Sequence, residues 1–190
     1  MNKLALKVTL ECYFGFNYIY ASIIAIIVLS LIFLFKSNSL KRHGEKITRK
    51  DGFFVLGLTL YFTLLIGVML LNREVAGSRQ INWVPFWSYK KLCLEGKRTL
   101  LEQILFNVIA FIPWPILFAL VFPKMKKLLW SVGSAFVFSV CIEVTQLVFK
   151  LGMFEFDDMF HNTLGALIGY GILILFRKNI RAKRDKFLLE

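Results

Sequence analysis

Long apolar stretches alternate with short, mostly basic polar stretches along this chain. A membrane-spanning helix needs about 20 mainly apolar residues, and five windows satisfy that length. The first window is too long for a signal peptide and lacks a small-residue cleavage site, so we interpret it as a retained span. The pattern therefore predicts an all-α fold, a polytopic helical membrane bundle with about five transmembrane spans. The predicted spans are Phe16–Phe35, Phe53–Leu71, Ile104–Phe122, Leu128–Phe149 and Met159–Phe176.

The composition agrees with a membrane protein. Hydrophobic residues make up 57% of the 190 residues and the mean hydropathy is +0.65, which would leave a soluble fold with too much exposed apolar surface. No internal repeat is visible. We predict three parts: two N-terminal spans joined by a basic loop (1–71), a core with three spans (72–176) and a basic tail (177–190).

Lysine and arginine gather in Lys36–Gly52, in Pro123–Lys127 and in the tail from Arg177. Short cytoplasmic loops retain basic residues, so these segments and the C-terminus are predicted to lie on the cytoplasmic side of the cell membrane. Five spans then place the N-terminus and Asn72–Gln103 outside, although Asn72–Gln103 carries six basic residues of its own. The net charge of +12 follows from this topology and favours membrane lipids as partners. No nucleic-acid-binding motif is present, and no nucleic-acid partner is expected.

The segment Asn72–Gln103 is too irregular for a span. Pro85 lacks an amide hydrogen and opposes a long helix there. Aromatic side chains settle at headgroup depth, so we predict an outer aromatic loop, re-entrant or interfacial, whose aromatic residues serve as anchors more than as ligand contacts. Arg79 and Asn82 are candidates for ligand binding, because a guanidinium can pair with carboxylates or bind an anionic group bidentately. The aromatic residues are Trp83, Phe86, Trp87 and Tyr89.

Ionisable side chains inside apolar spans are costly and indicate a functional site. Glu143 and Gln146 are spaced i, i+3 and share one face of the fourth span. On the fifth span, Asp158 and Asn162 share a face, and the lower part of that face is glycine. Small residues allow close approach of helices, so Gly165 and Gly169 are predicted to seat the fifth span against the fourth.

A purely structural interpretation is also open. Asp157 or Asp158 could cap the fifth helix while the other polar residues form a hydrogen-bond network. A cap needs one carboxylate, however, and a buried glutamate costs several kcal/mol unless it is paired. For the set as a whole we favour ligand binding. The candidate ligand-binding residues are Arg79, Asn82, Asn107, Glu143, Gln146, Asp157, Asp158 and Asn162.

Asn107 lies near the outer end of the third span, which Pro113 and Pro115 are predicted to kink. His161 is interpreted as a packing or hydrogen-bonding residue, because one histidine and two carboxylates lack the spacing of a metal site. We expect no metal and no cofactor. Cys141 is interpreted as a small buried hydrophobic residue, and the sequence leaves open a disulfide between Cys12 and Cys93.

Together these residues resemble the VanZ-like membrane proteins. Four weak motifs carry the resemblance by their order and spacing. They are Arg79-x-x-Asn82-x-x-Pro85-Phe86, Asn107-x-x-x-Phe111-x-Pro113, Glu143-x-x-Gln146 and Asp157-Asp158-x-x-x-Asn162-x-x-Gly165-x-x-x-Gly169. The family usually has a glycine shortly after the proline of the third span, where this chain has Pro115.

The resemblance implies a link to reduced susceptibility to glycopeptide antibiotics, because the namesake of the family is associated with resistance to the lipoglycopeptide teicoplanin. The expected ligand is an amphiphile, either such an antibiotic or a lipid-linked cell-wall precursor, bound in an outer-leaflet polar pocket. The alternative is a membrane-embedded hydrolase or transferase of a lipid-linked substrate, with Glu143 as general base and Asp158 or His161 as acid or metal ligand. We favour binding, because no nucleophile with an adjacent base is present.

Overall fold

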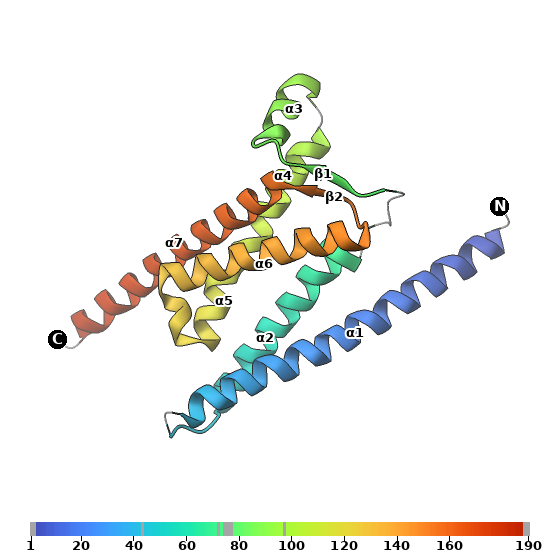
Figure 1. Cartoon of the computed structure of the whole chain (residues 1–190). Coiled ribbons are helices and arrows are strands. Elements are labelled where there is room, and N and C mark those ends of the chain that lie inside the picture. Colours follow the sequence, from blue (N-terminus) through green and yellow to red (C-terminus); the bar gives the residue numbers. More distant parts are fainter. Residues whose placement is uncertain (1–2, 43, 72, 74–77, 97, 188–190) are drawn as a thin grey trace. The chain divides into compact units, whose positions relative to one another are not determined.

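The computed structural model describes residues 3–42, 44–71, 73, 78–96 and 98–187. The chain forms two compact units, residues 1–73 and 74–190, and each is described by itself. Figure 1 shows that most of each unit is helical. Among the described residues, five helical segments are long and apolar enough to cross a bilayer, which confirms the predicted polytopic bundle. These segments are Ser22–Lys41, Arg49–Leu71, Arg98–Val121, Leu128–Phe149 and Phe156–Lys183.

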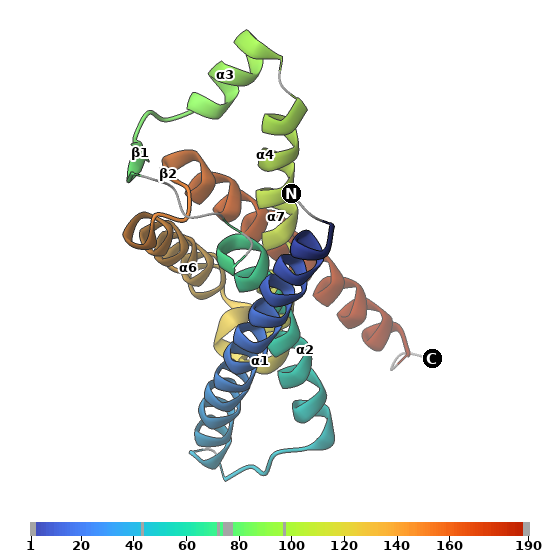
Figure 2. The same cartoon turned by 90° about the vertical axis from the view of Figure 1, so that its right-hand side faces the viewer.

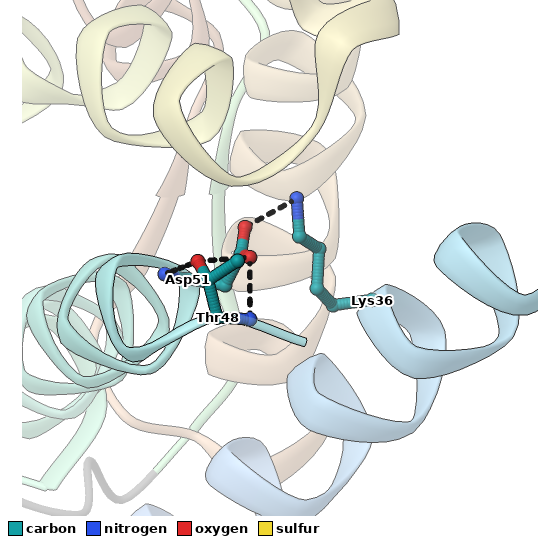
Figure 3. A network of polar contacts seen from close by, with 3 residues as sticks. All are labelled: Lys36, Thr48 and Asp51. Atoms are coloured by element: carbon teal, nitrogen blue, oxygen red, sulfur yellow. Dashed lines mark hydrogen bonds and ion pairs between the residues drawn. The ribbon is translucent and has the colours of Figure 1, made fainter. Parts of the chain in front are cut away.

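The first unit is a hairpin of two helices, α1 (Lys3–Lys41) and α2 (Arg49–Ile66), and α2 continues as a π-helical turn (Gly67–Leu71). Thr48 begins α2 with a capping box, in which its hydroxyl accepts from the Asp51 amide and the Asp51 carboxylate accepts from the Thr48 amide. Lys36 on α1 places its ammonium 3.0 Å from the same carboxylate, as Figure 3 shows. Lys36 is therefore buried in the hairpin as part of α1, and is not in the loop to which the sequence assigned it.

The pair formed by Lys36 and Asp51 should stabilise the hairpin unequally from its two sides. Asp51→Ala leaves a buried ammonium and removes the half of the capping box that the Asp51 carboxylate supplies, so we expect a loss of about 2 kcal/mol. Lys36→Met removes the charge that needs a partner and leaves the bonds between Thr48 and Asp51, so it should cost less. Thermal denaturation of the purified full-length protein measures both, and a larger loss from Lys36→Met would contradict this order.

The second unit is built around α7 (Phe156–Phe187), which packs along α4 (Arg98–Phe111), α5 (Pro113–Val121) and α6 (Leu128–Phe149). A short 3₁₀ turn, Pro123–Lys126, joins α5 to α6. The third predicted span is divided into α4 and α5 at Ile112, directly before the two prolines, in agreement with the predicted kink.

The polarity of α6 is that of a membrane helix, with its polar residues inside. Val137, Val144 and Val148 are exposed, whereas Ser139 and Glu143 are buried. Side chains that face lipid must be apolar, while polar groups are stable only within the bundle. Cys141 also lies on the exposed face, so its interpretation as a buried residue was wrong. Cys93 is free and exposed, and the side chain of Cys12 lies outside the described residues.

Gly165 and Gly169 seat α7 against α4 and its junction with α5, and not against α6 as predicted. A β-carbon on Gly165 would overlap the carbonyl oxygen of Val108, and one on Gly169 would overlap that of Ile112. The spacing correctly indicated close helix packing. It could not identify the partner, because Val108 and Ile112 contribute main-chain atoms that any residue type would supply.

Two short strands were not predicted. β1 (Gln80–Asn82) and β2 (Met153–Glu155) pair in parallel, with Ile81 opposite Phe154. Three-residue strands carry too little alternation to be recognised in a sequence, and this pairing joins segments about seventy positions apart. Figure 2 shows β1 beside β2, with α3 (Trp87–Glu95) beyond the start of α4. The segment 78–96, which contains β1 and α3, is called the aromatic cap below.

Candidate functional site

The polar faces of α6 and α7 meet inside the second unit. Asn162 on α7 donates through Nδ2 to the hydroxyl of Ser139 on α6, with a separation of 2.8 Å. The two helices are joined by a short connection and run in opposite directions, so one turn towards that connection along each helix leads to Asp158 and Glu143. The register therefore places the two predicted carboxylates at the same level of the helix pair. Both are buried, as is Gln146 one turn further along α6.

Glu143 is 1% exposed, and it also fixes the connection between the two helices. Its Oε2 accepts a hydrogen bond of 3.0 Å from the backbone amide of Glu155, the last residue of β2. A buried carboxylate is stable only where donors surround it. The Glu155 amide is one such donor. Its bond to Glu143 ties the end of β2 to α6.

Asn107 brings α4 into the same region. Its i+4 neighbour Phe111 contacts Phe138 of α6, with ring centroids 6.4 Å apart. Asn107 lies one turn before Phe111, towards the aromatic cap, and its neighbour Val108 packs against Gly165 of α7, three residues after Asn162. We call the buried set from these three helices the polar layer. It consists of Asn107, Ser139, Glu143, Gln146, Asp158 and Asn162.

The polar layer contains hydrogen-bonding atoms that the described part of the chain does not satisfy. Asn107 is 4% exposed and Asn162 is 1% exposed, yet Asn107 Nδ2 and Asn162 Oδ1 have no hydrogen-bond partner among the described residues. Buried polar atoms are nearly always paired, because an unpaired one costs about 1–3 kcal/mol. We call these two atoms the open donor (Asn107 Nδ2) and the open acceptor (Asn162 Oδ1). Such unsatisfied buried atoms are typical of a site that binds a polar group.

Asp157 is also buried, but its two hydrogen bonds within the described part of the chain are made with the N-terminus of α3 and not with residues of the polar layer. Its Oδ1 accepts from the Phe86 amide at 2.6 Å and its Oδ2 from the Ser88 amide at 2.8 Å, both at the beginning of α3. A carboxylate at a helix N-terminus satisfies amides that have no partner within the helix. The prediction that Asp157 or Asp158 caps its own helix therefore missed the role of Asp157, which holds the aromatic cap.

The backbone of the aromatic cap is strained at the position that Asp157 holds. Phe86 has φ of 60°, a left-handed conformation that is uncommon for a residue with a side chain. Its amide is fixed by Asp157, and its ring packs against Phe160 of α7 with centroids 5.7 Å apart. Strain of this kind persists only where surrounding contacts enforce it. Contacts with the start of α7 therefore determine the shape of the cap.

His161 lies beneath the aromatic cap and is fully buried. Its Nε2 and the hydroxyl of Tyr89 are hydrogen-bonded at 2.9 Å, and the two rings are in edge contact. Burial, and secondarily the Asp157 carboxylate, raises the pKa of Tyr89, so the hydroxyl stays protonated at neutral pH. His161 thus serves as a hydrogen-bonding residue between cap and bundle, which is the role the sequence indicated.

Arg79 and Asn82 lie at the edge of the site. Arg79 is exposed, one residue before β1. Asn82 accepts through Oδ1 from the amide of Val84 at 3.1 Å, a local turn that leads the chain towards Pro85. Asn82 therefore shapes the aromatic cap, and neither residue belongs to the buried polar layer.

Sequence reasoning missed Ser139 and Tyr89 as members of the site. Ser139 precedes Glu143 by four residues, so helical spacing from Glu143 could have found it. Tyr89 could not be found in this way, because its contact with His161 spans 72 positions. Among the described residues, no group of three His, Cys, Asp or Glu side chains is arranged to hold a metal ion.

The fold and the site define a class: a polytopic α-helical membrane protein with a buried polar layer beneath an aromatic cap. The family model for VanZ/LLP1 matches residues 18–177, and the chain belongs to this family. The match begins before the segment that carries the motifs and so includes both N-terminal spans. Protein VanZ from Enterococcus faecium is 25% identical over 134 residues, which cover 67% of this chain and 77% of that protein. No solved structure matches.

Proposed function

We propose that this protein lowers susceptibility to glycopeptide and lipoglycopeptide antibiotics, teicoplanin above all, by binding an amphiphile through the polar layer. The amphiphile is the antibiotic or a lipid-linked cell-wall component. The observation that carries the proposal is the open donor and acceptor of Asn107 and Asn162, buried in one layer with the carboxylates of Glu143 and Asp158. Membership of the VanZ/LLP1 family and similarity to Protein VanZ support the link to teicoplanin.

An amphiphile suits the setting of the polar layer. The layer lies within apolar helices near their ends, where a polar head could bind while an acyl chain stays in the bilayer. The aromatic cap beside it exposes Trp83, Phe86 and Leu94, side chains of the kind that reside at the membrane interface. A ligand entering from the membrane would therefore meet apolar surface first and hydrogen-bonding groups second.

The hydrolase alternative gains no support from the described contacts. Glu143 accepts from the Glu155 amide, and His161 is bonded to Tyr89, so neither is seen to activate a nucleophile.

The proposal requires the aromatic cap to face the exterior. Its support is the basic character of the opposite end of the second unit, where Lys124, Lys126 and Lys127 precede α6 and Arg177 begins the basic part of α7. Ser88 is buried, whereas Cys93 is exposed and offers a natural reporter. With Cys12 and Cys141 replaced by serine, Cys93 should react with a membrane-impermeant maleimide on intact cells. Labelling that appears only after permeabilisation would show that the aromatic cap faces the cytoplasm, which would contradict the proposed orientation.

Antibiotic susceptibility tests the function itself. A teicoplanin-sensitive host that produces the protein should tolerate more teicoplanin than the same host carrying an empty vector. Antibiotics that act inside the cell provide the control, since their potency should not change. Equal teicoplanin susceptibility at verified membrane levels of the protein would refute the proposed function.

A further inference from the structure

The unpaired atoms of the polar layer restrict the chemistry of what it binds. Asn107 Nδ2 can only donate a hydrogen bond and Asn162 Oδ1 can only accept one. The Asn162 amide is held between α6 and α7 by the bond from its Nδ2 to Ser139, so its open oxygen is fixed within the layer. A group that satisfies both atoms must therefore present both a donor and an acceptor.

Few head groups meet this requirement. A phosphate oxygen accepts but does not donate when ionised, and an ammonium donates but does not accept. A hydroxyl does both with one atom, and neighbouring hydroxyls can serve several protein groups at once. The layer also contains the carboxyl groups of Glu143 and Asp158, whose oxygens can accept hydrogen bonds from hydroxyls.

The charge of the layer also disfavours an anionic head group. Where the structure describes exposure in the second unit, no lysine or arginine is buried, while Glu143, Asp157 and Asp158 are. A phosphate placed beside these carboxylates would meet like charge at low dielectric. Arg79, the side chain expected to bind an anionic group, is exposed at the edge of the cap.

We infer that the head group bound by the polar layer is a sugar, whose hydroxyls pair with Asn107 and Asn162 and donate to the neighbouring carboxylates. The inference rests on the proposed function and specifies its ligand. Both a membrane glycolipid and a glycosylated antibiotic would present this chemistry. A trapped water could also bridge the two amides, and the experiment below separates that case.

The test uses the full chain in phosphatidylcholine nanodiscs and measures its melting temperature by intrinsic tryptophan fluorescence. Matched discs contain equal mole fractions of glucosyl diacylglycerol or of phosphatidic acid with the same acyl chains. A lipid that binds only the folded protein raises its melting temperature, and the rise grows with the ratio of lipid concentration to dissociation constant. Glucosyl diacylglycerol should raise the melting temperature and phosphatidic acid should not.

Variants connect the response to the polar layer. Asn107→Leu removes the open donor without creating a cavity, so it should fold in pure phosphatidylcholine yet bind the glycolipid roughly tenfold more weakly. Asn107→Ala should lose binding equally, and it keeps the test valid if leucine disturbs packing. Asn179→Leu, an exposed position on the same helix α7, should respond to the glycolipid like the parent.

Each outcome decides a separate point. Stabilisation by phosphatidic acid alone would overturn the sugar assignment and leave amphiphile binding standing. No response to either lipid, to teicoplanin or to its aglycone would overturn both and leave water as the partner of the amides. If teicoplanin stabilises the protein and its aglycone does not, the sugar comes from the antibiotic. A response to the glycolipid without one to teicoplanin identifies a membrane glycolipid.

Discussion

Replacing Gly165 with alanine should largely abolish accumulation of folded protein. The added β-carbon would overlap the Val108 carbonyl oxygen, a main-chain atom that cannot turn aside as a side chain can. The helices α4 and α7 would have to move apart where their backbones approach most closely. Overpacking typically costs about 1–3 kcal/mol, and a rigid main-chain neighbour places this case at the upper end. Fluorescence size-exclusion chromatography of a tagged protein measures the folded fraction.

Gly171 on the same helix provides the matched control. A β-carbon there meets nothing within 4 Å, so Gly171→Ala should be neutral or should stabilise α7 by up to about 1 kcal/mol. If Gly165→Ala and Gly171→Ala gave equal amounts of monodisperse protein, the close packing of α7 on α4 would be wrong.

Glu143→Gln should insert at the parental level and lose protection against teicoplanin. Glutamine keeps the shape of the side chain and an oxygen that can accept from the Glu155 amide, so the tie to β2 remains. What disappears is the negative charge. Hydrogen bonds to a charged group contribute about 1.5–3 kcal/mol, against about 0.5–1.5 kcal/mol for a neutral group, so ligand binding should weaken roughly five- to tenfold. The measurement is teicoplanin susceptibility normalised to membrane protein level.

Glu102→Gln separates a specific effect from a general change in charge. Glu102 is on the exposed surface of α4, where it pairs with Arg98 at 2.9 Å. Exposed pairs contribute little, so this variant should protect like the parent. Full protection by Glu143→Gln would exclude the charge of Glu143 from the mechanism.

The spans and the polar faces were predictable because they depend on local periodicity. Twenty apolar residues specify a span wherever they occur, and spacing of three or four residues placed Glu143 with Gln146 and Asp158 with Asn162. The buried state of all four follows from the cost of exposing polar groups to lipid. Local patterns therefore gave the class of fold and most of the polar layer.

The aromatic cap was not predictable in the same way, because its contacts are long-range. Asp157 bonds amides about seventy positions earlier, and a sequence cannot show which helix N-terminus a carboxylate will reach. The partner of Gly165 was missed because it is a carbonyl oxygen, which carries no sequence signal. Lys36 was assigned to the basic loop after the first predicted span, whereas it lies on α1 and Asp51 compensates its charge within the hairpin.

If the polar layer holds an amphiphile, native mass spectrometry of protein released from membranes should detect it directly. The parent should retain a bound amphiphile, and Glu143→Gln, prepared identically, should have lost most of it while Glu102→Gln keeps it. A parent that emerges without ligand, or a Glu143→Gln protein that retains the same ligand to the same extent, would contradict binding by the polar layer.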